Sequence, residues 1–142
     1  MQLTETFQYF KNDKIMKNRA ECFLLHNNTI IAKDGNRIIG KILWYVKKNP
    51  DDGLIEIEEL YVFENYRRKC IGSELVKASI KAIKRDFKDF GVKPRRIYLF
   101  TNENYQSAGN LYEKFGFKCI ANLGHLHSEN ENNLFYIRFD KK

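Results

Sequence analysis

The sequence has few of the residues that mark disulfide-rich proteins and flexible linkers. It contains three cysteines and two prolines in 142 residues. Cys22, Cys70 and Cys119 are odd in number and have no paired spacing, so we expect free thiols in a reducing compartment. No repeat, low-complexity tract or Pro/Gly/Ser-rich linker divides the chain. We therefore expect a single domain over residues 1–142.

Long hydrophobic runs are also missing. No stretch approaches the roughly 18 to 20 apolar residues of a membrane-spanning helix, and the first residues lack the apolar segment of a secretion signal. These absences favour a cytoplasmic protein without a membrane partner. Hydrophobic residues still make up 43% of the chain and aromatic residues 14%, which is enough for a packed core.

Acidic residues are outnumbered by basic ones. The chain has 18 Asp and Glu against 25 Lys and Arg, a net charge of +7. Such a balance favours a polyanionic partner, either a nucleic acid or a small phosphate-rich cofactor, although a solvated lysine surface explains it equally well. The cations are spread along the chain without interleaved aromatic residues, so we do not expect a nucleic-acid partner.

Turn signals and alternating hydrophobic residues predict a β-hairpin in the first half of the chain. Asp34-Gly35-Asn36 separates two β-branched runs, residues 29–32 and 37–47. In the second run, alternation places a set of residues on one face: Ile38, Gly40, Ile42, Trp44 and Val46. Residues 4–26 instead show apolar spacings of three to five, which predict one or two amphipathic helices with no strand before them.

The remainder predicts a mixed α/β domain. After a turn at residues 49–53 we expect strands at 54–62, 96–101, 117–122 and 134–140. We expect a long helix at 71–90 and a shorter one from Asn104 or Ser107 to Phe115. The long helix should bury one face: Gly72, Val76, Ile80, Ile83, Phe87 and Phe90. Its position between two strands predicts a crossover that joins parallel neighbours.

A cationic loop at residues 63–69 precedes the long helix. The first turn of a helix has free backbone N–H groups and a positive dipole end, and therefore binds phosphate. Gly72 allows a phosphate to approach the backbone, Ser73 adds a hydroxyl donor, and three cations lie beside them: Arg67, Arg68 and Lys69. The alternative is an ordinary helix start with a solvated basic loop.

Two segments resemble motifs of the GNAT acetyltransferase superfamily. Residues 67–72, Arg-Arg-Lys-Cys-Ile-Gly, resemble its pyrophosphate signature Gln/Arg-x-x-Gly-x-Gly/Ala, and Leu60, Tyr61 and Val62 resemble the strand before it. Ala108, Leu111, Tyr112, Gly116 and Phe117 resemble its Ala-x-x-Leu-Tyr-x-x-x-Gly-Phe helix. Cys70 stands at the first glycine of the signature. Asn104 lies one residue before the family's asparagine, where this chain has Tyr105.

The resemblance implies an acetyl-CoA-dependent N-acetyltransferase that acts on a primary amine of a small molecule or protein. It implies a mostly antiparallel central sheet with one splayed parallel strand pair and flanking helices. The pantetheine arm would lie in that gap, where a backbone N–H near Tyr61 or Val62 polarises the thioester carbonyl. The implied acetyl-CoA contacts are Leu60, Tyr61, Val62, Arg67, Arg68, Lys69, Cys70, Ile71, Gly72, Ser73, Asn104, Ser107 and Tyr112.

Acetyl transfer to an alkyl amine requires proton transfers. Such an amine has a pKa of about 10.4 and arrives protonated, so a carboxylate must take the proton, directly or through water. Glu56, Glu58 and Glu59 are the candidates. Alternation places Glu56 and Glu58 on one face and Glu59 on the other. Family members often carry a bulge in this strand. Because amine-acetylating relatives carry acids at the matching positions, we rank Glu58 first and Glu59 second; the alternative is a solvent-facing acidic edge.

Tyr112 matches the family's tyrosine, whose hydroxyl lies near the cofactor sulfur and protonates the leaving thiolate. The alternative is a packed helix tyrosine. The three glutamates favour a cationic acceptor, such as a polyamine, an aminoglycoside-like compound, a protein N-terminus or a lysine. His125 and His127 lie in a polar loop without a third ligand, so we expect no metal.

Three further points stay open at this stage. A catalytically silent acyl-CoA-binding module is one alternative to an enzyme, and a basic nucleic-acid-binding protein is another. The family includes homodimers, so a homodimer is an option that the sequence does not decide. Cys70 beside three cations should have a lowered thiol pKa and could form a mixed disulfide with coenzyme A, although an inert residue at a glycine position is the simpler interpretation.

Overall fold

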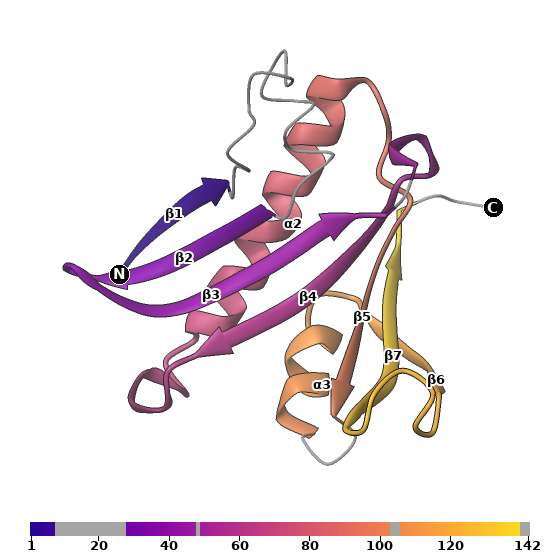
Figure 1. Ribbon diagram of the computed structural model, residues 1–142. Helices are drawn as coiled ribbons and strands as arrows, with labels where there is room; N and C mark the ends of the chain where they lie inside the picture. The colour runs from indigo at the N-terminus through magenta and orange to yellow at the C-terminus, as the bar shows by residue number, and fades with distance from the viewer. Residues whose placement is uncertain (8–27, 48, 103–105, 140–142) are drawn as a thin grey trace.

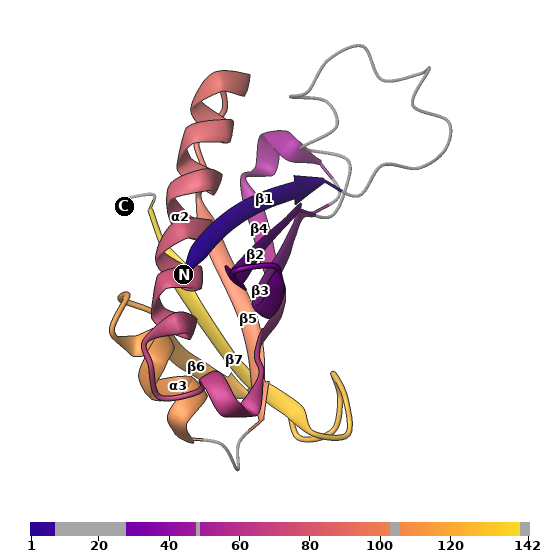
Figure 2. The same ribbon diagram turned by 90° about the vertical axis from the view of Figure 1, so that its left-hand side faces the viewer.

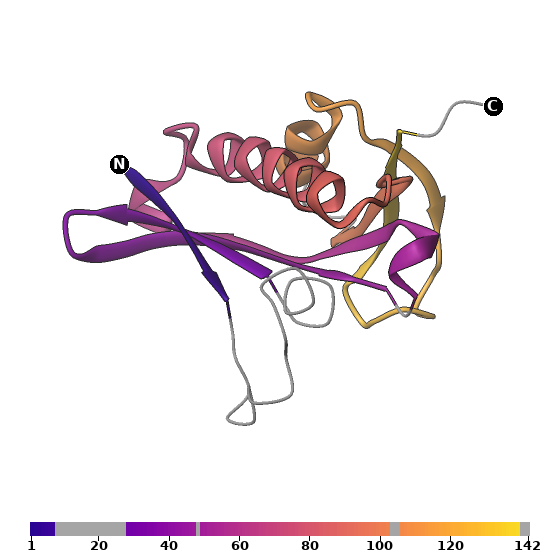
Figure 3. The ribbon, with the colours of Figure 1, turned by 90° about the horizontal axis from the view of Figure 1, so that it is seen from above.

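The computed structural model describes residues 1–7, 28–47, 49–102 and 106–139. Within these ranges seven strands form one sheet in the order β1-β2-β3-β4-β5-β7-β6, and helices α2 and α3 lie on the same side of it (Figures 1 and 3). The elements are β1 (Gln2–Phe7), β2 (Asn28–Asp34), β3 (Arg37–Val46), β4 (Leu54–Val62), α2 (Ile71–Phe90), β5 (Arg96–Asn102), α3 (Gln106–Glu113), β6 (Lys118–Asn122) and β7 (Glu131–Arg138). The predicted mixed α/β class is confirmed.

The first strand corrects the sequence-based expectation. Residues 4–7, predicted to begin a helix, belong to β1, which pairs antiparallel with β2 from Gln2↔Lys33 to Phe7↔Asn28. Figure 2 shows β1 at the edge of the sheet. The spacings that indicated helices continue into residues 8–26, which lie outside the described residues. The strand was missed because only a few residues alternate before that helical spacing begins.

The predicted hairpin of β2 and β3 is confirmed, with one change of register. The strands pair from Asn28↔Trp44 to Asp34↔Arg37, with a bulge between Ala32 and Lys33. The extra residue on β3 is Ile39, which is buried, whereas Ile38 is 47% exposed. The prediction that Ile38 shares the buried face is therefore wrong, because a bulge breaks the strict alternation of side chains.

Helix α2 covers the centre of the sheet and has the predicted bounds. Its buried side chains recur at helical spacing: Ile71, Leu75, Val76, Ser79, Ala82, Ile83 and Phe87. Phe90, expected on this face, is 39% exposed. The helix ends at Gly91, whose φ of +84° closes the last turn with backbone N–H groups on the carbonyls of Phe87 and Lys88.

Strands β4 and β5 form the only parallel pair among the described strands. Strand β4 pairs antiparallel with β3 and parallel with β5, from Leu54↔Arg96 to Ile57↔Leu99. Both strands continue past the last pair, β4 to Val62 and β5 to Asn102, and they diverge in Figure 1. The predicted splayed parallel pair is thus confirmed, and the gap opens toward α3 and the first turn of α2.

Neither α2 nor any other helix within the described ranges has the length and apolar composition required to cross a membrane.

Candidate active site

The loop from β4 to α2 is held in a strained backbone conformation. A 3-10 turn, Glu64–Tyr66, leads into residues 67–70, and both Arg68 and Cys70 have φ of +62°. Only glycine adopts this left-handed region without a steric penalty. Cys70 is the residue before the first turn of α2, so the position where the signature has glycine does require a left-handed backbone.

The cations of this loop differ in their contacts. Arg67 donates from Nε to the carbonyl oxygen of Val62 at 2.9 Å, which ties the loop to the end of β4. Lys69 lies 5.4 Å above the ring of Tyr66, and Arg68 is exposed. Residues 65–73 contain no acidic side chain. The start of α2 therefore presents cationic side chains beside the free N–H groups of its first turn.

The first turn of α2 is packed closely against its neighbours. The Ile71 side chain is 6% exposed and belongs to the core. A Cβ at Gly72 would lie 3.3 Å from Leu111 Cδ2 of α3, so this glycine allows α2 and α3 to approach. Ile71 and Gly72 can thus contact a phosphate only through their backbone, whereas Ser73 is half-buried and offers its hydroxyl.

A bulge in β4 decides how its three glutamates are arranged. The register moves from Leu43↔Glu59 to Trp44↔Ile57, which leaves Glu58 as the extra residue. Glu59 forms an ion pair with Lys41 at 3.2 Å, and Glu56 contacts Tyr45. Lys41 and Tyr45 lie on the same face of β3. Glu56 and Glu59 therefore lie on the same face, and the alternation that placed Glu59 on the opposite face from Glu56 is wrong. The expected bulge is present.

The three carboxylates also differ in burial. Glu56 is 7% exposed, whereas Glu58 and Glu59 are exposed. Glu58 follows Ile57, the last β4 residue paired with β5, so it lies where the strand gap begins. No ion pair joins it to another residue of the described ranges. It is the one carboxylate of the three without a cationic partner there.

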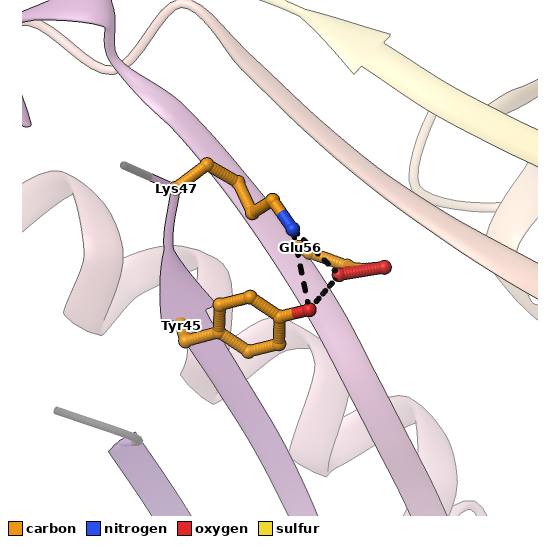
Figure 4. Close-up of polar contacts among 3 residues, drawn as sticks. All are labelled: Tyr45, Lys47 and Glu56. Atoms are coloured by element: carbon orange, nitrogen blue, oxygen red, sulfur yellow. Dashed lines mark hydrogen bonds and ion pairs between the residues drawn. The ribbon is translucent and has the colours of Figure 1, made fainter. Parts of the chain in front are cut away.

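Glu56 is the centre of a polar cluster that sequence reasoning missed (Figure 4). It accepts a hydrogen bond from the Tyr45 hydroxyl and lies 3.6 Å from Lys47 Nζ. Burial and this hydrogen bond raise the pKa of Tyr45 to about 12. Burial alone would lower the pKa of Lys47. The hydrogen bond to Tyr45, together with the nearby Tyr98 and Glu56, outweighs burial and raises the pKa above its usual value. The cluster is a neutral phenol with a paired carboxylate and ammonium.

Tyr112 lies in α3 beside the gap. Its side chain is 5% exposed and packs edge-on against Phe117, with ring centroids 5.5 Å apart. Burial, and to a lesser extent the charge of Glu131, raise the pKa of the Tyr112 phenol. The hydroxyl therefore stays protonated at neutral pH. Ser107 is exposed near the start of α3 and does not cap it; Asn104 lies outside the described residues.

A hollow of about 500 Å³ opens on the other face of the sheet. It is lined by Leu54, Arg96, Tyr98, Phe100, Ile120, Leu134, Tyr136 and Arg138. Alternation along β5 and β7 could have predicted which side chains share a face of each strand, such as Tyr98 and Phe100. It could not have predicted that β5 and β7 are neighbours, which brings Tyr136 beside them. His127 stacks on Phe100, with centroids 3.6 Å apart. The loop between β6 and β7 therefore borders the hollow.

The remaining predictions concern cysteines and histidines. Cys70 and Cys119 are free thiols, and Cys22 lies outside the described residues. His125 Nδ1 lies 3.3 Å from the Glu129 carbonyl. Within the described ranges no three potential metal ligands come together.

Comparisons with known proteins complete the description of the site. The model of the Acetyltransferase (GNAT) family matches residues 2–117. The chain belongs to this family. A GNAT family acetyltransferase from Elizabethkingia anophelis, solved with acetyl-CoA bound, has the same fold, with a TM-score of 0.67 and 19% identity over 96% of this chain and 98% of that one.

Two curated GNAT relatives are N-alpha-acetyltransferases. The protein of Sulfurisphaera tokodaii is 34% identical over 105 residues, 66% of this chain and 60% of the relative. That of Saccharolobus solfataricus is 33% identical over 76 residues, 54% of this chain and 42% of the relative. This GNAT chain thus spans about half the length of the curated relatives that it matches.

Proposed function

We propose that this protein is an acetyl-CoA-dependent N-acetyltransferase that acetylates a primary amine. One observation carries the proposal: the pairing of β4 with β5 stops at Ile57↔Leu99, and the gap beyond it opens toward both the cationic start of α2 and the tyrosine-bearing helix α3 (Figure 1). Family membership and the acetyl-CoA complex of the Elizabethkingia structure support it.

The residues at the start of α2 fit a diphosphate. Arg68 and Lys69 are exposed cations, and the left-handed backbone of Cys70 turns the chain into the helix. Arg67 fixes the loop to β4 and completes the positive potential. When bound, acetyl-CoA supplies the acetyl thioester. The chain binds its diphosphate with the backbone of residues 70–72, the Ser73 hydroxyl and these cations, and its pantetheine arm with the open edge of β4.

Glu58 is the proposed proton acceptor. It lies at the start of the gap and has no cationic partner in the described ranges, whereas the carboxylate of Glu59 is paired with Lys41. Glu58 takes a proton from the acceptor ammonium, directly or through water, and leaves a neutral nucleophile. Glu59 is the second candidate.

The buried phenol of Tyr112 is the proposed proton donor. The hydroxyl is protonated at neutral pH and so holds a proton for the leaving thiolate. Burial raises its pKa and makes it a weaker acid, so the proposed role rests on its position beside the gap. A backbone N–H of β4 near Tyr61 or Val62 would stabilise the negative charge that develops on the carbonyl oxygen, an effect of about 3 kcal/mol for one well-aimed donor.

The α-amino group of a peptide or protein is the proposed acceptor, since both curated relatives are N-alpha-acetyltransferases. An α-amine has a pKa of about 8, well below that of a lysine side chain. A larger fraction is therefore neutral at pH 7, and the demand on the base is smaller. Lysine and polyamine nitrogens are the competing acceptors.

The test is steady-state acetylation of peptides by the purified protein and its variants. We expect Glu58→Gln and Tyr112→Phe each to lower kcat by about 100-fold, because each removes a proton-transfer group. Glu113→Gln, which removes an exposed carboxylate of α3, should keep full turnover. Full activity of both active-site variants with chemistry rate-limiting would contradict the roles. Acetyl-CoA binding without turnover on any amine would identify a silent acyl-CoA-binding module.

A further inference from the structure

The aromatic hollow on the sheet face away from α2 and α3 has the size of a ligand site. Its volume of about 500 Å³ lies within the range of small-molecule sites. Six of its eight lining residues are aromatic or aliphatic: Leu54, Tyr98, Phe100, Ile120, Leu134 and Tyr136. Covering apolar surface of this kind with an apolar group is favourable, because it removes both surfaces from water.

The walls of the hollow are fixed by neighbouring contacts. Tyr98 and Phe100 meet edge to face, with centroids 6.2 Å apart, and His127 stacks on Phe100. Burial, followed by the charge of Glu56, raises the pKa of Tyr98, so its phenol stays neutral beside the Glu56 cluster. A rigid wall requires little ordering when a ligand binds.

The charges around the hollow disfavour a polycation. The acidic cluster that favoured a cationic acceptor is largely neutralised, because Glu56 is paired with Lys47 and Glu59 with Lys41. None of the eight residues that line the hollow is acidic. A polyamine or a lysine-rich segment would therefore find no carboxylate in the lining to pair with its ammonium groups.

The hollow also adjoins the strand gap. Phe100 directly follows Leu99, the last β5 residue paired with β4, just as Glu58 follows Ile57 on β4. A ligand whose amine lies at the gap can therefore place a group attached to the neighbouring carbon along Tyr98 and Phe100. One end of the hollow can therefore accommodate both an acceptor amine, at the gap, and the apolar group next to it, along the aromatic wall.

We propose that this hollow binds the first side chain of the acceptor, and that the preferred acceptor is a peptide N-terminus with a large apolar first residue such as Phe, Leu or Met. The inference rests on the proposed acetyltransferase function and deepens it. Among the acceptors expected from the sequence, it selects the protein N-terminus over a polyamine, an aminoglycoside-like compound and a lysine.

The experiment compares peptides that are identical except for a first residue of Phe, Gly or Lys, with spermidine as the polyamine. We expect the Phe peptide to have a kcat/KM about 10- to 100-fold above that of the Gly and Lys peptides. Ile120→Glu adds a charge to the hollow at a residue that is 53% exposed and so tolerates the change. It should remove the preference for Phe.

Ile38→Glu is the matched control, because Ile38 is a 47% exposed strand isoleucine that does not line the hollow. It should keep the preference for Phe. Calorimetry should show equal acetyl-CoA affinity in both variants, which separates acceptor recognition from cofactor binding. Wild-type preference for Lys or spermidine, or a Phe preference that survives Ile120→Glu, would overturn the inference while leaving acetyltransfer intact. Failure to bind acetyl-CoA would overturn both proposals.

Discussion

Replacing Cys70 with glycine should stabilise the protein. Cys70 has φ of +62°, a conformation that costs an L-residue about 1–2 kcal/mol. Glycine removes that cost but loses about 0.5–1 kcal/mol through the greater freedom of the unfolded chain. The difference predicts a gain of roughly 0.5–1 kcal/mol in unfolding free energy, which corresponds to a rise in Tm of about 2–4 °C.

Two variants separate backbone strain from loss of the thiol. Cys119→Gly makes the same chemical change at an exposed cysteine inside strand β6, where glycine should destabilise by roughly 0.5–1 kcal/mol. Cys70→Ala removes the thiol and keeps the strained conformation, so we expect a change near zero. Urea unfolding followed by fluorescence of Trp44, the single tryptophan and a buried one, provides the measurement. A Cys70→Gly protein as unstable as Cys119→Gly would refute the reasoning.

Two further predictions concern stability. The pKa of Tyr45 is about 12 in the folded protein against an ordinary 10.0. The neutral Tyr45 phenol therefore contributes fully to the free energy of unfolding below about pH 10, and this contribution is lost as the pH rises toward 12. In urea unfolding, Tyr45→Phe should make the free energy of unfolding fall less steeply over this alkaline range. Gly109→Ala would place a Cβ 3.1 Å from Phe135 Cζ and should lower Tm despite the better helix propensity of alanine, whereas Asn110→Ala at the exposed next position should leave Tm equal or higher. Equal effects at the two α3 positions would contradict this packing.

Much of the fold was predictable because local signals and tertiary structure agree. The Asp-Gly turn of the β2–β3 hairpin, the 3.6-residue period of α2 and the glycine after it were each visible in the sequence. The cation-rich segment before Gly72 and the Leu-Tyr pair of α3 gave the two motifs. Their chemistry depends on residues that are close in sequence, so pattern analysis could find them.

The errors arose where strand partners decide the outcome. Two bulges, at Ile39 and Glu58, shift the face of every following side chain, and alternation alone cannot place a bulge. The pairing of Glu56 with Lys47 depends on the β3–β4 register, and the hollow depends on β7 lying beside β5. These neighbours are far apart in sequence and are set by the strand order of the whole sheet.

Calorimetric titration with acetyl-CoA and S-acetylpantetheine tests the central claim that the start of α2 binds a diphosphate. The second ligand keeps the thioester and lacks the diphosphate. We predict saturable acetyl-CoA binding at least about 10-fold tighter than that of S-acetylpantetheine, since charge-assisted hydrogen bonds each contribute about 1.5–3 kcal/mol. Arg68→Gln should reduce this difference, and Arg37→Gln, at an exposed arginine of β3, should not. Absence of acetyl-CoA binding at millimolar concentration, or equal affinity for both ligands, would contradict the account.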